Sequence, residues 1–160
     1  MAKMPAPGDP APDFEGPTQT GETLRLSSLR GRPVALYFYP KDDTPGCTKQ
    51  ACNLRDHTDA LTGAGVAVVG VSADGTASHE RFAEKYGLPF PLVADPDREI
   101  LEAYGVWGER SLYGKTVVGT KRTTFLIGPD GTVLHVFKRP KTDRHAEEIL
   151  AKLAALTPEE

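Results

Sequence analysis

Two kinds of hydrophobic pattern alternate along the chain. The first is a short, continuous apolar run bounded by turn residues, which is typical of a buried strand. Runs of this kind lie at residues 32–40, 65–72 and 90–95. The second is an apolar residue at every third or fourth position, which predicts an amphipathic helix. We expect helices at residues 47–61, 78–87, 97–105 and 144–156.

Two further segments complete the expected sheet. Residues 20–29 read as a turn and a short strand, and residues 123–138 as two strands joined at Pro129-Asp130-Gly131. The order is then strand, helix, strand, helix, strand, followed by a hairpin and a helix, which describes an α/β sheet with mixed strand directions. We therefore expect a thioredoxin-like fold, with a central mixed β-sheet flanked by helices and an N-terminal β extension.

Length and composition favour a single domain spanning residues 1–160. The chain has 160 residues, of which 39% are hydrophobic, and this is enough for one compact core. Only the Pro- and Ala-rich residues 1–12 and the last residues, 157–160, are expected to be loose.

The charge of the chain argues against nucleic acid or an anionic membrane as the main partner. The formal net charge is −3, and no run of Lys or Arg occurs. The first residues lack the apolar core of a signal peptide, and no stretch approaches the ~18 apolar residues that span a bilayer. We expect a soluble, cytoplasmic protein that acts on a small molecule or another protein.

The two cysteines, Cys47 and Cys52, lie only five positions apart, which is wider than the redox pair Cys-x-x-Cys. In a reducing cytosol, cysteines are more often catalytic, redox-sensing or metal-binding than permanently cross-linked. The four histidines show no ligand spacing to the cysteines, so the sequence does not indicate a zinc site.

Helical geometry separates the two thiols. At 100° per residue, Cys47 opens an apolar stripe with Ala51 and Leu54, whereas Cys52 lies about 140° around the helix, on the side of Asp56. A thiol in the first turn lies at the positive end of the helix dipole, which favours the thiolate. Cys47 is therefore the better nucleophile, and Cys52 should remain largely a thiol because carboxylates lie near it.

The residues before Cys47 prepare this helix terminus. Pro45 and Gly46 impose a tight approach and turn successive N–H groups toward one spot. Thr44 could cap the helix or hydrogen-bond a bound substrate. Capping is the commoner role of such a threonine, but the cysteine three residues later favours the substrate role.

The stretch YPKDDTPGC (39–47) resembles the active-site pattern Pro-x-x-x-Thr/Ser-x-x-Cys of the peroxiredoxins. With its second cysteine five residues later, TPGCTKQAC resembles the bacterioferritin-comigratory or PrxQ subgroup. GVWGERSLYGK and RTTFLI are further matches in the right order, and the resemblance spans about residues 5–155. The sequence departs from the subgroup at Gln50, where Glu is common, and at Gly128, where Asp is usual. We expect neither residue to contact the reacting groups.

This resemblance implies a role for each matching residue. Cys47 would be the peroxidatic cysteine and Cys52 the resolving cysteine. Thr44 would hydrogen-bond the peroxide, Pro40 would shield the pocket, and Arg122 would be the cation that holds thiolate and peroxide. It implies reduction of hydroperoxides through a sulfenic acid and an intramolecular disulfide, with thioredoxin or a similar dithiol protein as reductant. No metal or organic cofactor is required. We expect a monomer or a weak homodimer.

Two other functions stay open from the residues alone. One is thiol–disulfide exchange, which the missing Cys-x-x-Cys opposes. The other is a non-catalytic redox sensor or binding module that uses the same disulfide as a signal. Taken without its context, Arg122 would more often be a solvated surface residue. Rapid stoichiometric consumption of peroxide, and sustained turnover with a reductant, distinguish a peroxidase from both alternatives.

Overall fold

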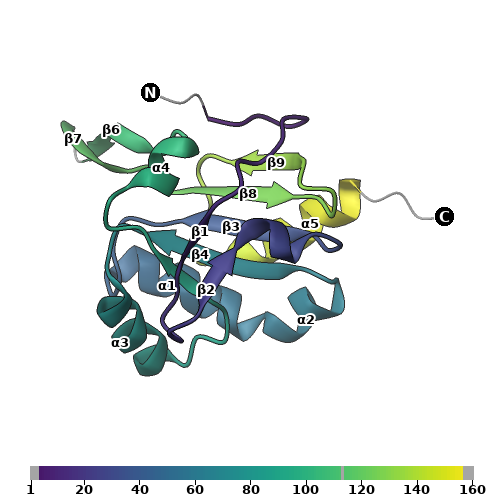
Figure 1. The fold of residues 1–160 in the computed structure, drawn as a ribbon, viewed down its shortest axis with the longest axis horizontal. Helices are drawn as coiled ribbons and strands as arrows, with labels where there is room; N and C mark the ends of the chain where they lie inside the picture. Colours follow the sequence, from purple (N-terminus) through teal and green to yellow (C-terminus); the bar gives the residue numbers. More distant parts are fainter. Residues whose placement is uncertain (1–3, 113, 157–160) are drawn as a thin grey trace.

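The computed structural model describes residues 4–112 and 114–156, which form a central β-sheet with helices on both faces (Figure 1). Its strands are β1 (Glu15–Pro17), β2 (Thr23–Arg25), β3 (Val34–Phe38), β4 (Ala67–Ser72), β5 (Leu92–Ala94), β6 (Trp107–Leu112), β7 (Lys115–Thr120), β8 (Thr123–Ile127) and β9 (Val133–Phe137). Its helices are the 3-10 helix η1 (Leu26–Leu29) and the α-helices α1 (Pro45–Asp56), α2 (Thr58–Gly63), α3 (Thr76–Tyr86), α4 (Glu99–Ala103) and α5 (His145–Leu156).

The central sheet has the strand order β5-β4-β3-β8-β9. Strands β3, β4 and β5 are parallel to one another, whereas β8 runs antiparallel to both β3 and β9. All five residues of the central strand β3 are buried, which explains why its sequence is continuously apolar. The expected mixed sheet of a thioredoxin-like fold is therefore confirmed.

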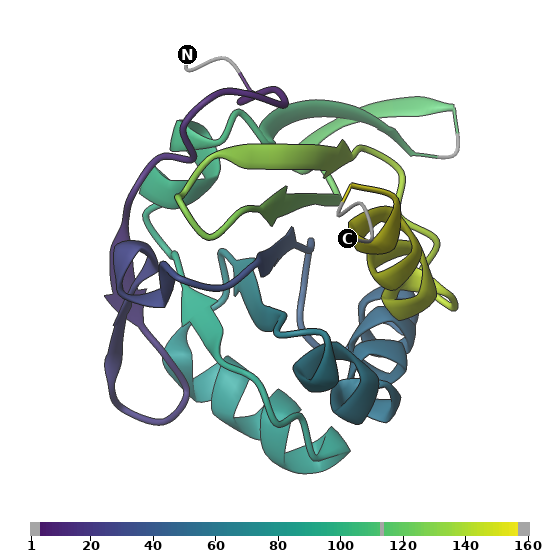
Figure 2. The same ribbon diagram turned by 90° about the vertical axis from the view of Figure 1, so that its right-hand side faces the viewer.

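Two hydrophobic cores cover the two faces of this sheet. Consecutive residues of β3 point to opposite faces, so Tyr37 packs with the helices α1, α2, α3 and α5, and Phe38 packs with α4 and η1. Figure 2, which views the molecule from its right-hand side, shows α1 and α5 side by side against one face, in agreement with their contacts. The site described below lies where β3 passes into α1.

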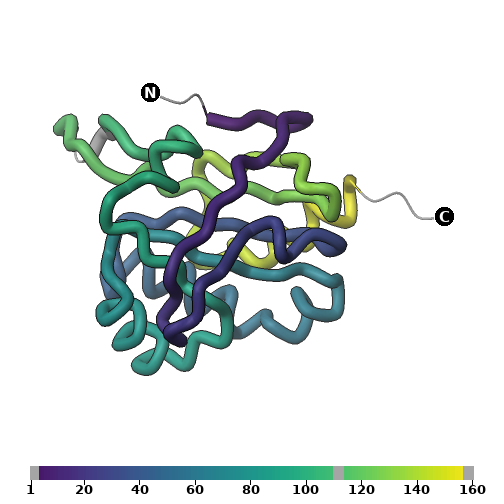
Figure 3. Tube along the Cα trace, viewed as in Figure 1, coloured from purple at the N-terminus to yellow at the C-terminus, as the bar shows by residue number. Residues whose placement is uncertain are grey.

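The N-terminal β extension is confirmed as the antiparallel pair β1 and β2. Figure 3 traces the preceding segment from the edge near β9 down across the sheet. The expectation that residues 1–12 are loose does not hold for residues 8–11, because Gly8 N and Ala11 N donate to the carbonyl oxygens of Val133 and Gly131. Residues 1–3 and 157–160, which we also expected to be loose, lie outside the described residues.

The predicted helix over residues 47–61 is interrupted at His57, so this prediction is wrong in its extent. The chain forms two helices, α1 and α2, because side chains compete for the helical carbonyl groups at the junction. His57 Nδ1 lies 2.8 Å from the carbonyl oxygen of Asn53. The hydroxyl of Thr58 donates to the carbonyl oxygen of Arg55 at 2.7 Å.

Strands β6 and β7 were not predicted from the sequence. They form a separate two-stranded hairpin.

Candidate active site

Cys47 lies in the first turn of α1, on the side of the helix that faces the sheet. Its exposed fraction is 1%, and Ala51 and Leu54 on the same stripe are completely buried. The predicted core-facing position of Cys47 is therefore confirmed. The helix begins at Pro45, which has no N–H, so the N–H groups of Gly46 and Cys47 lie at its start without helical partners.

Arg122 comes from the loop between β7 and β8 and reaches the sulfur of Cys47. Its Nη2 donates to Cys47 Sγ at 3.3 Å, and its Nη1 donates to Gln50 Oε1 at 2.6 Å. The planar guanidinium is thus held by two contacts in one orientation. A fixed cation beside the sulfur stabilises the thiolate by charge and by hydrogen bonding.

Gln50 contributes to this arrangement through Arg122, a role that was not predicted from the sequence. It is completely buried on α1, one turn after Cys47, where its side chain can meet the guanidinium that contacts the sulfur. The i, i+3 spacing from Cys47 is a signal in the sequence that could have identified Gln50. Gly128, the other departure, lies in the turn between β8 and β9.

Gly46 allows the guanidinium to approach the start of the helix. A Cβ atom at this position would lie 3.1 Å from Arg122 Nη2, tighter than nearly all real contacts of this kind. The glycine predicted to shape the helix entry therefore also makes room for the arginine.

Thr44 occupies the N-cap position of α1, but its side chain makes no capping hydrogen bond. Its hydroxyl instead donates to the carbonyl oxygen of Lys41 at 2.9 Å. The oxygen lone pairs of that hydroxyl can accept a hydrogen bond from a ligand. Pro40 is half-buried two residues after the end of β3, at the opening of the same loop.

Cys52 is partly exposed on α1, whereas Cys47 is buried, and both are free thiols. The expected separation of the two side chains on the helix is therefore confirmed. Within the described residues, no cluster of three or more His, Cys, Asp or Glu side chains could hold a metal ion.

Tyr37 on β3 adds an unusual buried hydroxyl to the core beside Cys47. Its ring packs over Gly70 of β4, where a Cβ would lie 2.9 Å from the ring, and its hydroxyl has no hydrogen-bond partner within the described part of the chain. Burial raises the pKa of Tyr37 well above its usual range, and charge on Cys47 raises it further. Tyr37 therefore stays neutral beneath the helix.

These groups suit one kind of chemistry. The buried sulfur has a guanidinium at 3.3 Å and lies in the first turn of a helix, beside unpaired N–H groups. These groups stabilise negative charge on the sulfur before and during its attack on a substrate, which suits a nucleophile. On a thioredoxin-like fold, this combination defines the class of thiol peroxidases.

Comparison with known proteins agrees with this class. The AhpC/TSA family matches residues 7–136. Peroxiredoxin Bcp of Escherichia coli strain K12 is 50% identical over 143 residues, which cover 89% of this chain and 92% of that protein. The crystal structure of peroxidoxin BcpB from Mycobacterium tuberculosis has a TM-score of 0.84 and 40% identity, over 96% of this chain and 99% of that one. A cysteine-to-serine mutant of PrxQ from Xylella fastidiosa has a TM-score of 0.88 and 33% identity, over 97% and 98% of the two chains.

The chain therefore belongs to the AhpC/TSA family, and within it resembles the Bcp and PrxQ peroxiredoxins. It is a peroxidase and thus an oxidoreductase. None of the helices in residues 4–112 and 114–156 is long and apolar enough to span a membrane.

Proposed function

We propose that Cys47 attacks hydrogen peroxide and organic hydroperoxides, and that Cys52 resolves the product. The observation that carries this assignment is the 3.3 Å contact between Arg122 Nη2 and Cys47 Sγ at the start of α1. Within the described residues, the fixed cation and the helix N-terminus lie beside Cys47 and not beside Cys52, and this asymmetry separates the attacking thiol from the resolving one.

The reaction moves two electrons from sulfur to oxygen. The Cys47 thiolate attacks the terminal peroxide oxygen, the O–O bond breaks, and the leaving oxygen takes a proton to become water or an alcohol. Arg122 and the N–H groups at the helix start stabilise the charge as it passes from sulfur to the leaving oxygen. Thr44 hydrogen-bonds the bound peroxide, and Pro40 shields the pocket from water.

The resulting Cys47 sulfenic acid condenses with the Cys52 thiol, which forms a disulfide and releases water. An external dithiol then reduces the disulfide and becomes oxidised itself. Thioredoxin or a similar dithiol protein fits this step. The balance requires no metal or organic cofactor.

Relatives support the choice of substrate. A bacterioferritin comigratory protein from Xanthomonas campestris, 34% identical to this chain, is described by its alkyl peroxide reduction activity. We extend this substrate class to the present protein, acting in antioxidant defence in the cytoplasm. We further propose one peroxiredoxin domain for the whole chain, as a monomer or weak homodimer. Analytical ultracentrifugation of the reduced protein tests the oligomeric state.

Single-cysteine variants test the assignment. Cys47→Ser should consume no peroxide, whereas Cys52→Ser should consume about one equivalent and stop at the sulfenic acid, because attack and resolution belong to different thiols. A dimedone adduct on Cys47, detected by mass spectrometry, identifies the stalled species. Equal residual turnover in the two variants would contradict the assignment. Failure of the wild-type protein to sustain turnover with thioredoxin would favour a redox sensor.

A further inference from the structure

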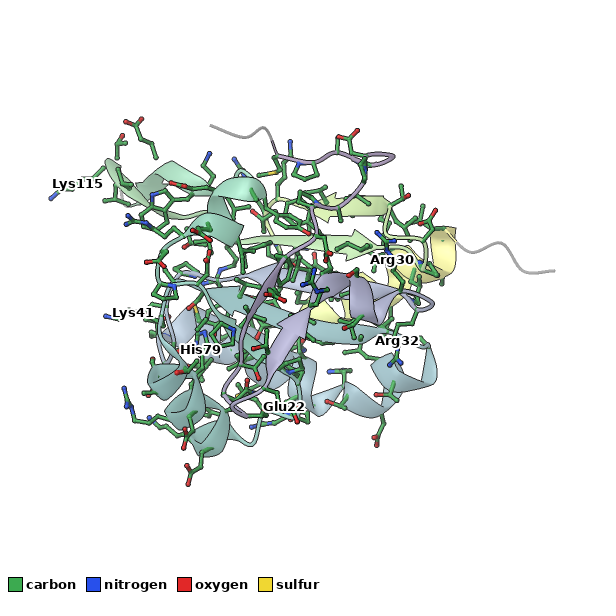
Figure 4. All side chains as sticks on the ribbon, viewed as in Figure 1. Glu22, Arg30, Arg32, Lys41, His79 and Lys115 are labelled. Carbon is green, nitrogen blue, oxygen red and sulfur yellow. The ribbon has the colours of Figure 1, made fainter. Side chains whose placement is uncertain are left out.

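A cluster of charged and polar side chains lies beside the active site, in the buried space between the β3–α1 loop and α3. Asp42 in this loop accepts hydrogen bonds from the hydroxyl of Tyr39 at 2.5 Å and from that of Ser78 at 2.8 Å. His79 Nδ1 lies 2.6 Å from Asp42 Oδ2, and the side chains of His79 and Asp42 are only 0% and 4% exposed. In Figure 4, Lys41 points away from the molecule at the edge where His79 lies inside.

Both ring nitrogens of His79 lie within hydrogen-bond distance of a partner, so the imidazole is fixed in one orientation. Its Nε2 lies 3.0 Å from the carbonyl oxygen of Val93, which can only accept, so Nε2 carries a hydrogen. Its Nδ1 forms a short hydrogen bond with the carboxyl group of Asp42, which joins α3 to the loop before α1. Loss of either partner would leave a buried polar atom of the other without its hydrogen bond, which is more costly than at the surface.

The loop that Asp42 anchors has a strained backbone. Asp43 has a φ of 57°, in the left-handed region that residues other than glycine rarely adopt. Its carboxylate is held by Lys85 Nζ at 2.8 Å and by the hydroxyl of Tyr86 at 2.7 Å. Such strain persists only where the surroundings fix it, and here the residues that fix it belong to α3.

The same loop carries the groups that face the peroxide. Thr44 follows Asp42 by two residues, and its hydroxyl is bonded to the carbonyl oxygen of Lys41. The first turn of α1 begins at Pro45, immediately after Thr44. The backbone position of residues 41–44 therefore sets where the Thr44 hydroxyl and the free N–H groups lie relative to Cys47.

We propose that Asp42 and His79 are positioning residues of the peroxidase reaction. Through this pair, α3 holds residues 41–44 in the arrangement that aligns Thr44 and the start of α1 with the bound peroxide. The proposal rests on the peroxidase function proposed above. The two residues act through the loop, and their loss should affect alignment more than the availability of the thiolate.

The test compares two reactions of the same thiol. In a Cys52→Ser background, the rate constants of Cys47 with hydrogen peroxide and with iodoacetamide are measured for Asp42→Asn, His79→Gln and the double variant. Both reactions need the thiolate, but only the peroxide reaction needs aligned donors. We expect each single variant to slow the peroxide reaction about 10- to 100-fold and to change alkylation by less than about twofold. The double variant places two amide side chains opposite each other, which can hydrogen-bond, and should recover part of the lost rate.

Asp95→Asn is the matched control. Asp95 is also a buried acid, 5% exposed, but its carboxylate accepts from Leu101 N at the start of α4. This variant should leave both rates unchanged. If Asp42→Asn does not fold, Ser78→Ala removes one donor to Asp42 without unpairing a charge and should give a smaller loss with the same selectivity.

Wild-type peroxide rates in folded single variants, or equal losses in the two reactions, would overturn the positioning role. A Cys52→Ser protein that retains Asp42 and His79 yet does not react with peroxide would instead contradict the proposed function, so the two failures are distinguishable.

Discussion

Cys47 and Cys52 lie in one uninterrupted helix, Pro45–Asp56, and both are free thiols. Residues five apart in such a helix have Cα atoms roughly 8.6 Å apart, as its rise, turn and radius require. A disulfide tolerates at most about 6.8 Å. The two thiols can therefore join only if the first turns of α1 unwind, and the same helix must be intact to activate Cys47.

Replacement of Arg122 by Ala should slow the attack on peroxide by about 100- to 1,000-fold, because a fixed donor to developing charge is typically worth about 3 kcal/mol. Stopped-flow measurement of Cys47 oxidation gives the rate. Arg122→Lys keeps the charge but not the planar pair of contacts to Cys47 and Gln50, so we expect an intermediate rate. A wild-type rate in Arg122→Ala would mean that the contact with the sulfur is only structural.

Replacement of Gln50 by Met should slow peroxide attack by about tenfold, because Arg122 loses a charge-assisted hydrogen bond that orients it. Gln50→Glu is the informative comparison, since it keeps an acceptor for the guanidinium. Its rate should stay nearer to that of the wild type. If both variants react as slowly as Arg122→Ala, Gln50 contributes more than orientation of the arginine.

Tyr37→Phe should leave the free energy of unfolding of the reduced protein unchanged or raise it. The Tyr37 hydroxyl is buried with no partner in the described ranges, and removing an unsatisfied group relieves its desolvation cost. Tyr39→Phe is the matched control, since the Tyr39 hydroxyl donates to Asp42 at 2.5 Å and its loss should cost about 1.5–3 kcal/mol. Urea unfolding of both variants measures the difference, and destabilisation by Tyr37→Phe equal to that of Tyr39→Phe would reveal a bonded hydroxyl.

Stability should fall as the pH drops below about 6.5, partly because of His145. Burial lowers the pKa of His145, although its hydrogen bond to Glu148 opposes this shift. The unfolded chain therefore binds a proton before the folded chain does. The contribution of His145 to the free energy of unfolding is complete above the pKa that it has in the unfolded chain. This contribution is lost as the pH falls toward the lower pKa that His145 has in the folded protein.

Urea unfolding at pH 7.5 and 5.5 tests this contribution. The wild-type protein should lose more stability over this interval than His145→Gln. Burial also lowers the pKa of His135, but that residue is present in both proteins, so its contribution cancels. Identical losses in the two proteins would contradict the role of His145.

Strands β3, β4 and β5 could be predicted because each reads as a short apolar run that is largely buried. Strands β8 and β9 could be predicted because the turn Pro129-Asp130-Gly131 joins them. The hairpin of β6 and β7 could not be predicted in this way, because it forms a separate sheet in which most residues of β7 are exposed or half-buried, with Val118 65% exposed. The end of α1 at His57 depends on side-chain bonds to two carbonyl groups, which compete with an otherwise helical pattern.

The site was predictable where the chemistry is local. The position of Cys47 on the buried stripe follows from helical spacing, whereas the contact of Arg122 with it joins residues 75 positions apart and was implied only by family resemblance. The pair of Asp42 and His79 spans 37 positions and has no local signature, since each is an ordinary polar residue of a loop or helix. Long-range partners of this kind require the folded structure.

The central claim is that α1 is folded while Cys47 attacks and unwound when Cys47 is joined to Cys52. Hydrogen exchange of the amides from Lys49 to Arg55, measured by NMR or by fragment mass spectrometry, tests it most directly. Exchange at these amides should be slow in the reduced protein and much faster after peroxide has formed the disulfide. Amides of β4, which is hydrogen-bonded between β3 and β5, should remain equally protected in both states. Unchanged protection of residues 49–55 in a protein shown to contain the Cys47–Cys52 disulfide would contradict the account.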